Sequence, residues 1–205
     1  MEDINIGDIY CYSDKKILTP ESYKTKRRST GIGIVVSSAY GIVRIVSLNA
    51  HNNGNKYQFM TGNCEYDYNE VVSSKNMSIA LRDINGHKNT INIIDQCEGR
   101  FTWESRRYLN EINYKYRDEL DWYVPSLGEL VRLANSRDII LESIETCKLT
   151  EYPLYKILNE GDSLVSSTQV NDKLMYQLNF GSATVELVGK TGLVKCISFK
   201  RISIG

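Results

Sequence analysis

Residues suited to covalent catalysis are few in this 205-residue chain, which holds only two histidines, His51 and His87. Nucleophilic catalysis needs a serine or cysteine beside a histidine that a third group orients. His51 lies in a polar stretch and His87 in the turn-like "DINGHKNT", and neither stands in a pattern typical of such a site. The acids of "EYDYNE" are no more specific, because 25 acidic residues are spread along the chain. We predict no catalytic residues and no enzymatic activity.

One glycine-rich stretch, "VGKTG" at residues 188–192, could be taken for a phosphate-binding loop. Such a loop needs a further glycine five residues before Gly189, where Thr184 stands, and a helix after it. The residues that follow, "LVKCISF", have the pattern of a strand. We therefore interpret the stretch as a hairpin turn, and we predict no cofactor.

The cysteines could supply metal ligands or disulfides. No CxxC pair occurs and the histidines are isolated, so the clustered soft ligands of a zinc or iron–sulfur site are absent from the sequence, and we predict no metal site. We interpret the cysteines as small core hydrophobes of a protein that stays in a reducing compartment. They are Cys11, Cys64, Cys97, Cys147 and Cys196.

Charge and composition exclude two classes of partner. The 25 basic residues balance the 25 acidic residues and the pI is about 6.7, which argues against a nucleic-acid binder because such a protein needs a basic face. The first residues, "MEDINIGDIYCYSDKK", show no signal peptide, and no apolar run is long enough to cross a membrane. We expect a soluble protein, assembled in the cytoplasm, that binds neither nucleic acid nor membrane.

The best candidates for binding are three tyrosines. The stretch from His51 to Asn76 has no clear periodicity and predicts a long surface loop, in which Tyr57, Tyr66 and Tyr68 stand beside Gly, Asn and acidic residues. Tyrosine offers a large contact area at low cost in rotamer entropy, so these residues could bind a ligand or a partner. The alternative, that they cover the core edge or an oligomer contact, carries more weight.

The arrangement of strand and helix patterns predicts the fold class. The first third is β-rich, with "GIGIVVSS" and "YGIVRIVSL" joined at Ala39–Gly41, and the middle shows helical spacing. In the last third, "KLMYQLNF" alternates apolar and polar residues, and the strands after it predict an antiparallel meander. The order predicts an α+β fold with antiparallel strands flanking a central helical segment, in one domain over residues 1–205.

A local motif, "DWYVPSLGEL" at residues 121–130, predicts how the central helices begin. Pro125 ends an extended segment, and Ser126 followed by Glu129 forms the S-x-x-E pattern of a helix capping box. Trp122 and Tyr123 precede the turn and alternate sides. We expect one of them in the core and the other at its margin.

The same motif carries a family resemblance. "WYVPSLGEL" resembles the "WYLPSxxEL" signature of the DUF1566-type domains of Bacteroidetes and their phages, and "DINGHKNTINII" and "LVSSTQ" resemble further segments of that family. Those domains are similar to the C-type-lectin-like fold, so the resemblance implies a single C-type-lectin-like domain. The sequence lacks the "EPN" and "WND" motifs of calcium-dependent lectins and the paired catalytic cysteines of formylglycine-generating enzymes.

The resemblance implies a non-enzymatic structural or adhesion module. We expect a phage virion component (a head-fibre, tail-fibre or decoration protein) that is located in the virion, forms a homo-oligomer, and contacts other virion proteins or a host-surface ligand. The alternative is a bacterial cell-surface adhesin-like domain that binds carbohydrate or protein. An enzyme related to the formylglycine-generating enzymes is a less favoured third reading.

Overall fold

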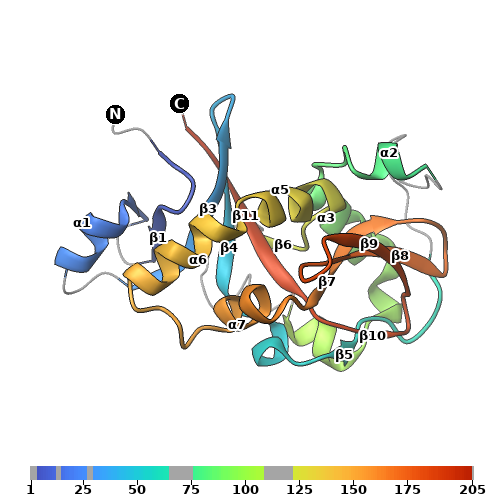
Figure 1. Cartoon of the computed structure of the whole chain (residues 1–205). Coiled ribbons are helices and arrows are strands. Elements are labelled where there is room, and N and C mark those ends of the chain that lie inside the picture. Colours follow the sequence, from blue (N-terminus) through green and yellow to red (C-terminus); the bar gives the residue numbers. More distant parts are fainter. Residues whose placement is uncertain (1–3, 13–14, 27–29, 65–75, 109–121, 205) are drawn as a thin grey trace.

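A six-stranded antiparallel sheet forms one layer of the protein (Figure 1). The computed structural model describes residues 4–12, 15–26, 30–64, 76–108 and 122–204. The strand order is β2-β1-β3-β4-β11-β6, so the last strand of the chain, β11, lies between β4 and the edge strand β6. Its strands are β1 (Ile9–Cys11), β2 (Ile17–Leu18), β3 (Gly31–Ala39), β4 (Ile42–Ala50), β6 (Trp122–Tyr123) and β11 (Ile197–Ser203).

Two smaller sheets lie to the right of this layer in Figure 1. The first is an antiparallel meander of three strands in the order β7-β8-β9, and the second pairs β10 with β5. Their strands are β5 (Tyr57–Gln58), β7 (Ser163–Gln169), β8 (Leu174–Asn179), β9 (Thr184–Gly189) and β10 (Leu193–Val194).

Helices α5, α6 and α7 pack their apolar sides against one face of the six-stranded sheet. Leu130 of α5, Ile140 of α6 and Ile157 of α7 share one buried cluster with Ile34 of β3 and Val46 of β4. Among the described residues no helix has the length and apolar character needed to cross a membrane. The helices are α1 (Pro20–Thr25), α2 (Met77–Ala80), α3 (Gly86–Cys97), α5 (Leu127–Asn135), α6 (Arg137–Thr146) and α7 (Pro153–Glu160), with short 3-10 helices η1 (His51–Gly54) and η2 (Glu98–Arg100).

The α+β fold class with antiparallel sheets is confirmed, and so is the hairpin turn at Ala39–Gly41, which joins β3 to β4. The meander prediction is right for β7 to β9 and wrong beyond them. After the turn at Gly189–Gly192, β10 pairs with β5, and β11 enters the large sheet between β4 and β6. The C-type-lectin-like assignment and the single-domain boundary stay predictions.

The prediction of one long surface loop over residues 51–76 is wrong for its first half. Residues 51–64 contain η1 and β5, and Met60 forms a β-bridge with Phe101. The side chains of Tyr57, Phe59 and Met60 are buried in a cluster with Ile93 and Val194. The partner strand β10 lies near the other end of the chain, so no local pattern reveals this pairing. Residues 65–75 lie outside the described residues.

The reading of every cysteine as an isolated core thiol is also wrong. Cys64 and Cys97 form a disulfide between the end of the β5 segment and the last residue of α3, with their Cα atoms 6.0 Å apart. The remaining three, Cys11, Cys147 and Cys196, are buried and form no disulfide. Disulfide pairing depends on three-dimensional proximity, which a separation of 33 residues does not disclose.

Helix α5 begins in the interior, and residues from distant segments bond its first amides. The capping box predicted at Ser126 is present, and the Ser126 amide donates to Glu129 Oε2 at 2.9 Å. The Leu127 amide donates to Thr168 Oγ1 at 2.8 Å, and the Gly128 amide donates to the Asp83 carbonyl oxygen at 3.0 Å. These contacts satisfy donors that water cannot reach. We call this group of residues the α5 junction.

The Glu129 carboxylate also ties the junction to the large sheet. Its Oε1 atom accepts a hydrogen bond from Arg44 Nε on β4 at 3.1 Å and from the Tyr123 hydroxyl on β6 at 2.8 Å. Arg44 and Glu129 are both buried. A buried ion pair of this kind tolerates the loss of one partner poorly, because the other charge then remains in the interior.

Trp122 and Tyr123 lie in different buried clusters, as alternation along a strand requires. The expectation that one of them lies at the core margin is wrong, since their exposed fractions are 4% and 2%. The reason is that side chains pack on both faces of β6: Tyr123 lies in the cluster that includes Leu130 of α5, and Trp122 lies in the cluster that includes Ile45 of β4.

Replacing Arg44 by methionine should lower the free energy of unfolding by about 3 kcal/mol, because Glu129 is left buried without its cationic partner. The matched control is Lys156→Met, which removes an exposed pair with Glu160 of the same helix and should cost about 0.5 kcal/mol or less. Denaturant titration measures both values. Equal losses in the two variants would contradict the role given to Arg44.

Replacing both Cys64 and Cys97 by serine should lower stability by about 3–4 kcal/mol, because the unfolded chain regains the freedom of the closed loop. In denaturant, oxidised wild-type protein should expose three titratable thiols without reductant and five with it. A count of five before reduction would show that the disulfide is not formed. The double variant is its own control, since reductant should leave its stability unchanged.

Candidate functional site

The α5 junction is the first place to consider, because perturbed acids mark many active sites. Burial raises the pKa of Glu129 despite its hydrogen bonds and Arg44, and burial together with Glu129 raises the pKa of Tyr123 well above its ordinary value. Asp83 lies beside them, and its Oδ2 atom accepts hydrogen bonds from Asn89 at 2.9 Å and Thr168 at 2.7 Å. The exposed fractions of Asp83 and Glu129 are 0% and 1%, so no substrate reaches either carboxylate. We conclude that the junction is structural.

Close packing supports the same conclusion. Gly86 begins α3 directly against the junction, and a Cβ atom at this position would stand 2.3 Å from Glu129 Oε2 and 2.7 Å from the Ser126 amide nitrogen. Gly128 is equally restricted, since its Cβ atom would meet the Asp83 carbonyl oxygen at 2.4 Å. The glycines in "DINGHKNT" and "PSLGEL" are therefore required for packing.

The second place is a cavity of about 790 Å³, which is in the size range of small-molecule sites. It lies between the end of β4, η1, β5, β11 and the helical segment that begins at Trp103. We call it the η1 cavity. The described residues that line it are 47, 49–53, 56–58, 102–104, 107, 108, 122, 193 and 198.

Three buried rings form the inner part of the η1 cavity. The His51 ring lies 4.1 Å from the Tyr57 ring and 4.3 Å from the Tyr108 ring, measured between centroids. The Tyr108 hydroxyl is hydrogen-bonded to the Ser198 hydroxyl on β11. Burial raises the pKa of Tyr57 and of Tyr108 well above the ordinary value, so both tyrosines stay neutral. Behind them, burial raises the pKa of the Cys196 thiol to about 12.

The outer part of the cavity is polar and exposed. Trp103 has 68% of its surface exposed, and the Arg107 guanidinium carbon lies 5.5 Å from the centre of its ring, a cation–π contact one helical turn apart. Asn52 and Asn53 of η1 adopt left-handed backbone conformations, with φ of 50° and 53°. Asn tolerates this conformation better than most residues, and such residues are often found at functional sites.

The η1 cavity is suited to binding. It combines an exposed aromatic face, cationic and acidic side chains from Lys56, Arg107 and Glu104, and several amides. The hydroxyl of Ser198 is already bonded to Tyr108. Within the described residues, no group of three or more His, Cys, Asp or Glu could hold a metal ion.

Of the three tyrosines predicted for binding, Tyr57 lines the η1 cavity. It is buried at its inner wall rather than exposed on a loop, because β5 pairs with β10. Tyr66 and Tyr68 lie outside the described residues. Sequence reasoning missed Trp103 and Arg107, although their spacing in "TWESRR" places a tryptophan and an arginine on the same side of a helix.

Comparison with known proteins bears on the fold. No protein-family model matches the chain, and no curated protein sequence matches it. Its structure is similar to that of a fimbrial protein from Bacteroides ovatus ATCC 8483, with a TM-score of 0.71, 16% sequence identity and 96% of this chain covered. The match covers 48% of the fimbrial protein, so this chain spans about half of its length. At this identity the likeness establishes a shared fold.

The buried carboxyl of Glu129 should make stability depend on pH. Its pKa is raised in the folded protein, so the folded state holds the proton more tightly than the unfolded chain does. That contribution is present at about pH 4 and is lost as the pH rises through the raised pKa. Relative to Glu129→Gln, which cannot titrate, the wild-type protein should therefore lose stability as the pH is raised from about 4 toward neutrality.

Denaturant titration of both proteins across this range measures the effect. The control Glu160→Gln changes an exposed acid at the end of α7 and should keep the wild-type pH profile. A constant difference between wild type and Glu129→Gln at every pH would contradict the assignment.

Proposed function

We propose that this chain is a non-enzymatic, adhesin-like module of a bacterial cell-surface protein. The observation that carries the proposal is the shared fold with a fimbrial protein over 96% of the chain. Because the likeness covers about half of that protein, the module would act as one part of a longer surface structure or beside a second domain. The binding activity would reside in the exposed outer part of the η1 cavity.

The disulfide between Cys64 and Cys97 supports export. Disulfides persist in oxidising environments and are rare in proteins of a reducing cytoplasm. This bond joins the β5 segment, which carries one wall of the η1 cavity, to the end of α3. The export reading replaces our expectation of a reducing compartment, which rested on five unpaired cysteines.

The resemblance to DUF1566-type domains is compatible with this role, since that family includes bacterial surface proteins as well as phage proteins. The role of a phage virion component, our first expectation from the sequence, stays a prediction. The fimbrial likeness and the disulfide favour the cell-surface alternative.

Location in the native organism tests the proposal. We expect brief protease treatment of intact cells to release peptides of this chain while a cytoplasmic marker protein stays intact. Alkylation of free thiols in whole cells, followed by mass spectrometry, should find Cys64 and Cys97 linked and Cys196 free. A chain that is protected in intact cells, or that is recovered with purified phage particles, would contradict the proposal.

A further inference from the structure

The outer part of the η1 cavity leaves a large apolar ring open to solvent. Trp103 is the more exposed of the two tryptophans, at 68% against 4% for Trp122 deeper in the same cavity. Tryptophan is enriched in binding sites because it gives a large rigid contact area together with a polar N–H group. An open Trp103 beside a cavity therefore indicates a ligand with an apolar face.

The polar groups around Trp103 narrow the class of ligand. Asn49, Asn52 and Asn53 are exposed at the cavity, and each amide can both donate and accept hydrogen bonds. Hydroxyl groups also donate and accept, so a polyhydroxylated ligand fits these side chains. A lipid or an apolar peptide would need aliphatic side chains in the lining. Among the described lining residues, only Ala50 and Leu193 are aliphatic. A sugar ring meets both demands, because its C–H face stacks on an aromatic ring and its edge carries hydroxyls.

The charged side chains at the η1 cavity narrow the class of ligand further. Lys56 and Arg107 are exposed at the cavity, and Glu104 is the one acid among its described lining residues. Arginine binds a carboxylate through two parallel hydrogen bonds, and its stacking on Trp103 holds the guanidinium in a defined plane. The charged side chains among the described lining residues thus favour a ligand that carries a negative charge.

The backbone near these groups is fixed in place before any ligand binds. The amide and the side-chain amide of Asn55 both donate to the Asn52 carbonyl oxygen at 3.0 Å, and the His51 amide donates to the Cys196 carbonyl oxygen at 3.1 Å. These bonds hold the left-handed residues Asn52 and Asn53 at the cavity. A site that is already ordered loses less conformational entropy on binding.

We propose that the η1 cavity binds a carboxylate-bearing saccharide, with a sugar ring against Trp103 and the carboxylate between Lys56 and Arg107. This proposal rests on the adhesin-like function and names the class of its ligand. Binding requires no calcium, because its contacts come from aromatic, amide and cationic side chains.

An array that prints uronic-acid and sialic-acid glycans beside their carboxyl-reduced, neutral counterparts tests the proposal on the purified, disulfide-bonded chain. We expect binding to acidic glycans, with affinity for the reduced counterparts lower by about tenfold. Trp103→Ala should weaken binding to both by about tenfold or more. Arg107→Gln should remove the preference for acidic glycans, and a chelator should change nothing.

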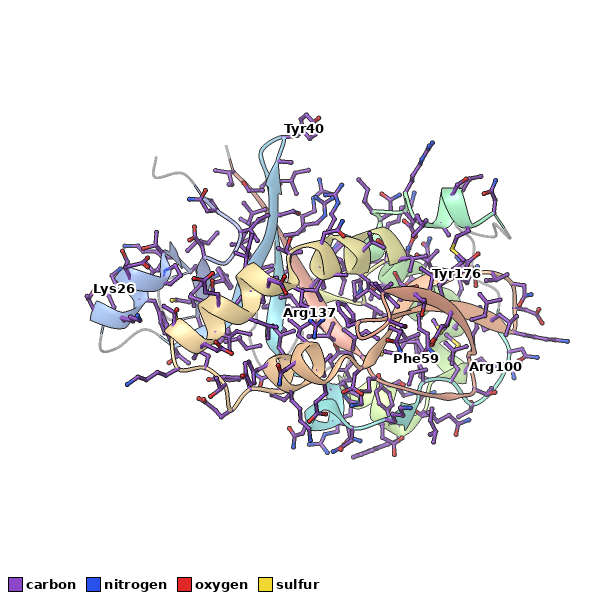
Figure 2. All side chains as sticks on the ribbon, in the orientation of Figure 1. Lys26, Tyr40, Phe59, Arg100, Arg137 and Tyr176 are labelled. Atoms are coloured by element: carbon purple, nitrogen blue, oxygen red, sulfur yellow. A yellow bond between two sulfur atoms is a disulfide. The ribbon has the colours of Figure 1, made fainter. Side chains whose placement is uncertain are left out.

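The control variant is Tyr40→Ala, which removes a fully exposed aromatic ring at the tip of the β3–β4 hairpin, away from the cavity (Figure 2). It should bind as the wild type does, and the circular dichroism of all variants should match the wild type. Absence of binding to any glycan, equal binding to the neutral counterparts, or full binding by Trp103→Ala would overturn the proposal. A chain that is found on the cell surface but binds no glycan would overturn this inference and leave the adhesin-like function standing.

Discussion

Helix α5 begins in the interior of the protein, where its first amide groups have no access to water. A buried amide without a partner costs about 1–3 kcal/mol, so each one must find an acceptor. The acceptors are Glu129 within the helix, the Asp83 carbonyl ahead of α3, and Thr168 on β7. Glu129 in turn binds Arg44 on β4. One helix start therefore fixes the positions of the large sheet, α3 and the three-stranded sheet relative to one another.

The η1 cavity depends on the same framework. Its inner rings come from η1, β5 and the helical segment that begins at Trp103. One of them, Tyr108, is hydrogen-bonded to Ser198 of β11, and β11 also pairs with β6 next to the α5 junction. The Cys64–Cys97 disulfide secures the far end of the β5 segment. The rigid inner part contrasts with the exposed Trp103 and Arg107, so the fold presents a few polar and aromatic groups on a fixed base. Such an arrangement suits recognition at a surface.

The sequence predicts those features of the structure that depend on short-range interactions along the chain. The capping box at Ser126 and Glu129, the turn at Ala39–Gly41 and the α+β order all follow from short-range rules, and the structure has them. The pairing of β5 with β10 and the disulfide join segments far apart in the chain, so no local pattern indicates them. For this reason the sequence predicts an exposed loop at Tyr57, whereas the structure buries its side chain in β5. Trp103 and Arg107 have helical spacing in the sequence, but only the folded structure shows that both side chains are exposed.

We propose that the ordered η1 cavity recognises an acidic sugar. A crystal structure of the chain soaked with an oligomer of galacturonic acid tests it most directly. We predict density for a sugar ring stacked on Trp103, a carboxylate within hydrogen-bond distance of Arg107, and an η1 backbone unchanged from the unliganded protein. An empty cavity at saturating oligosaccharide, or a sugar bound elsewhere on the surface, would contradict the account.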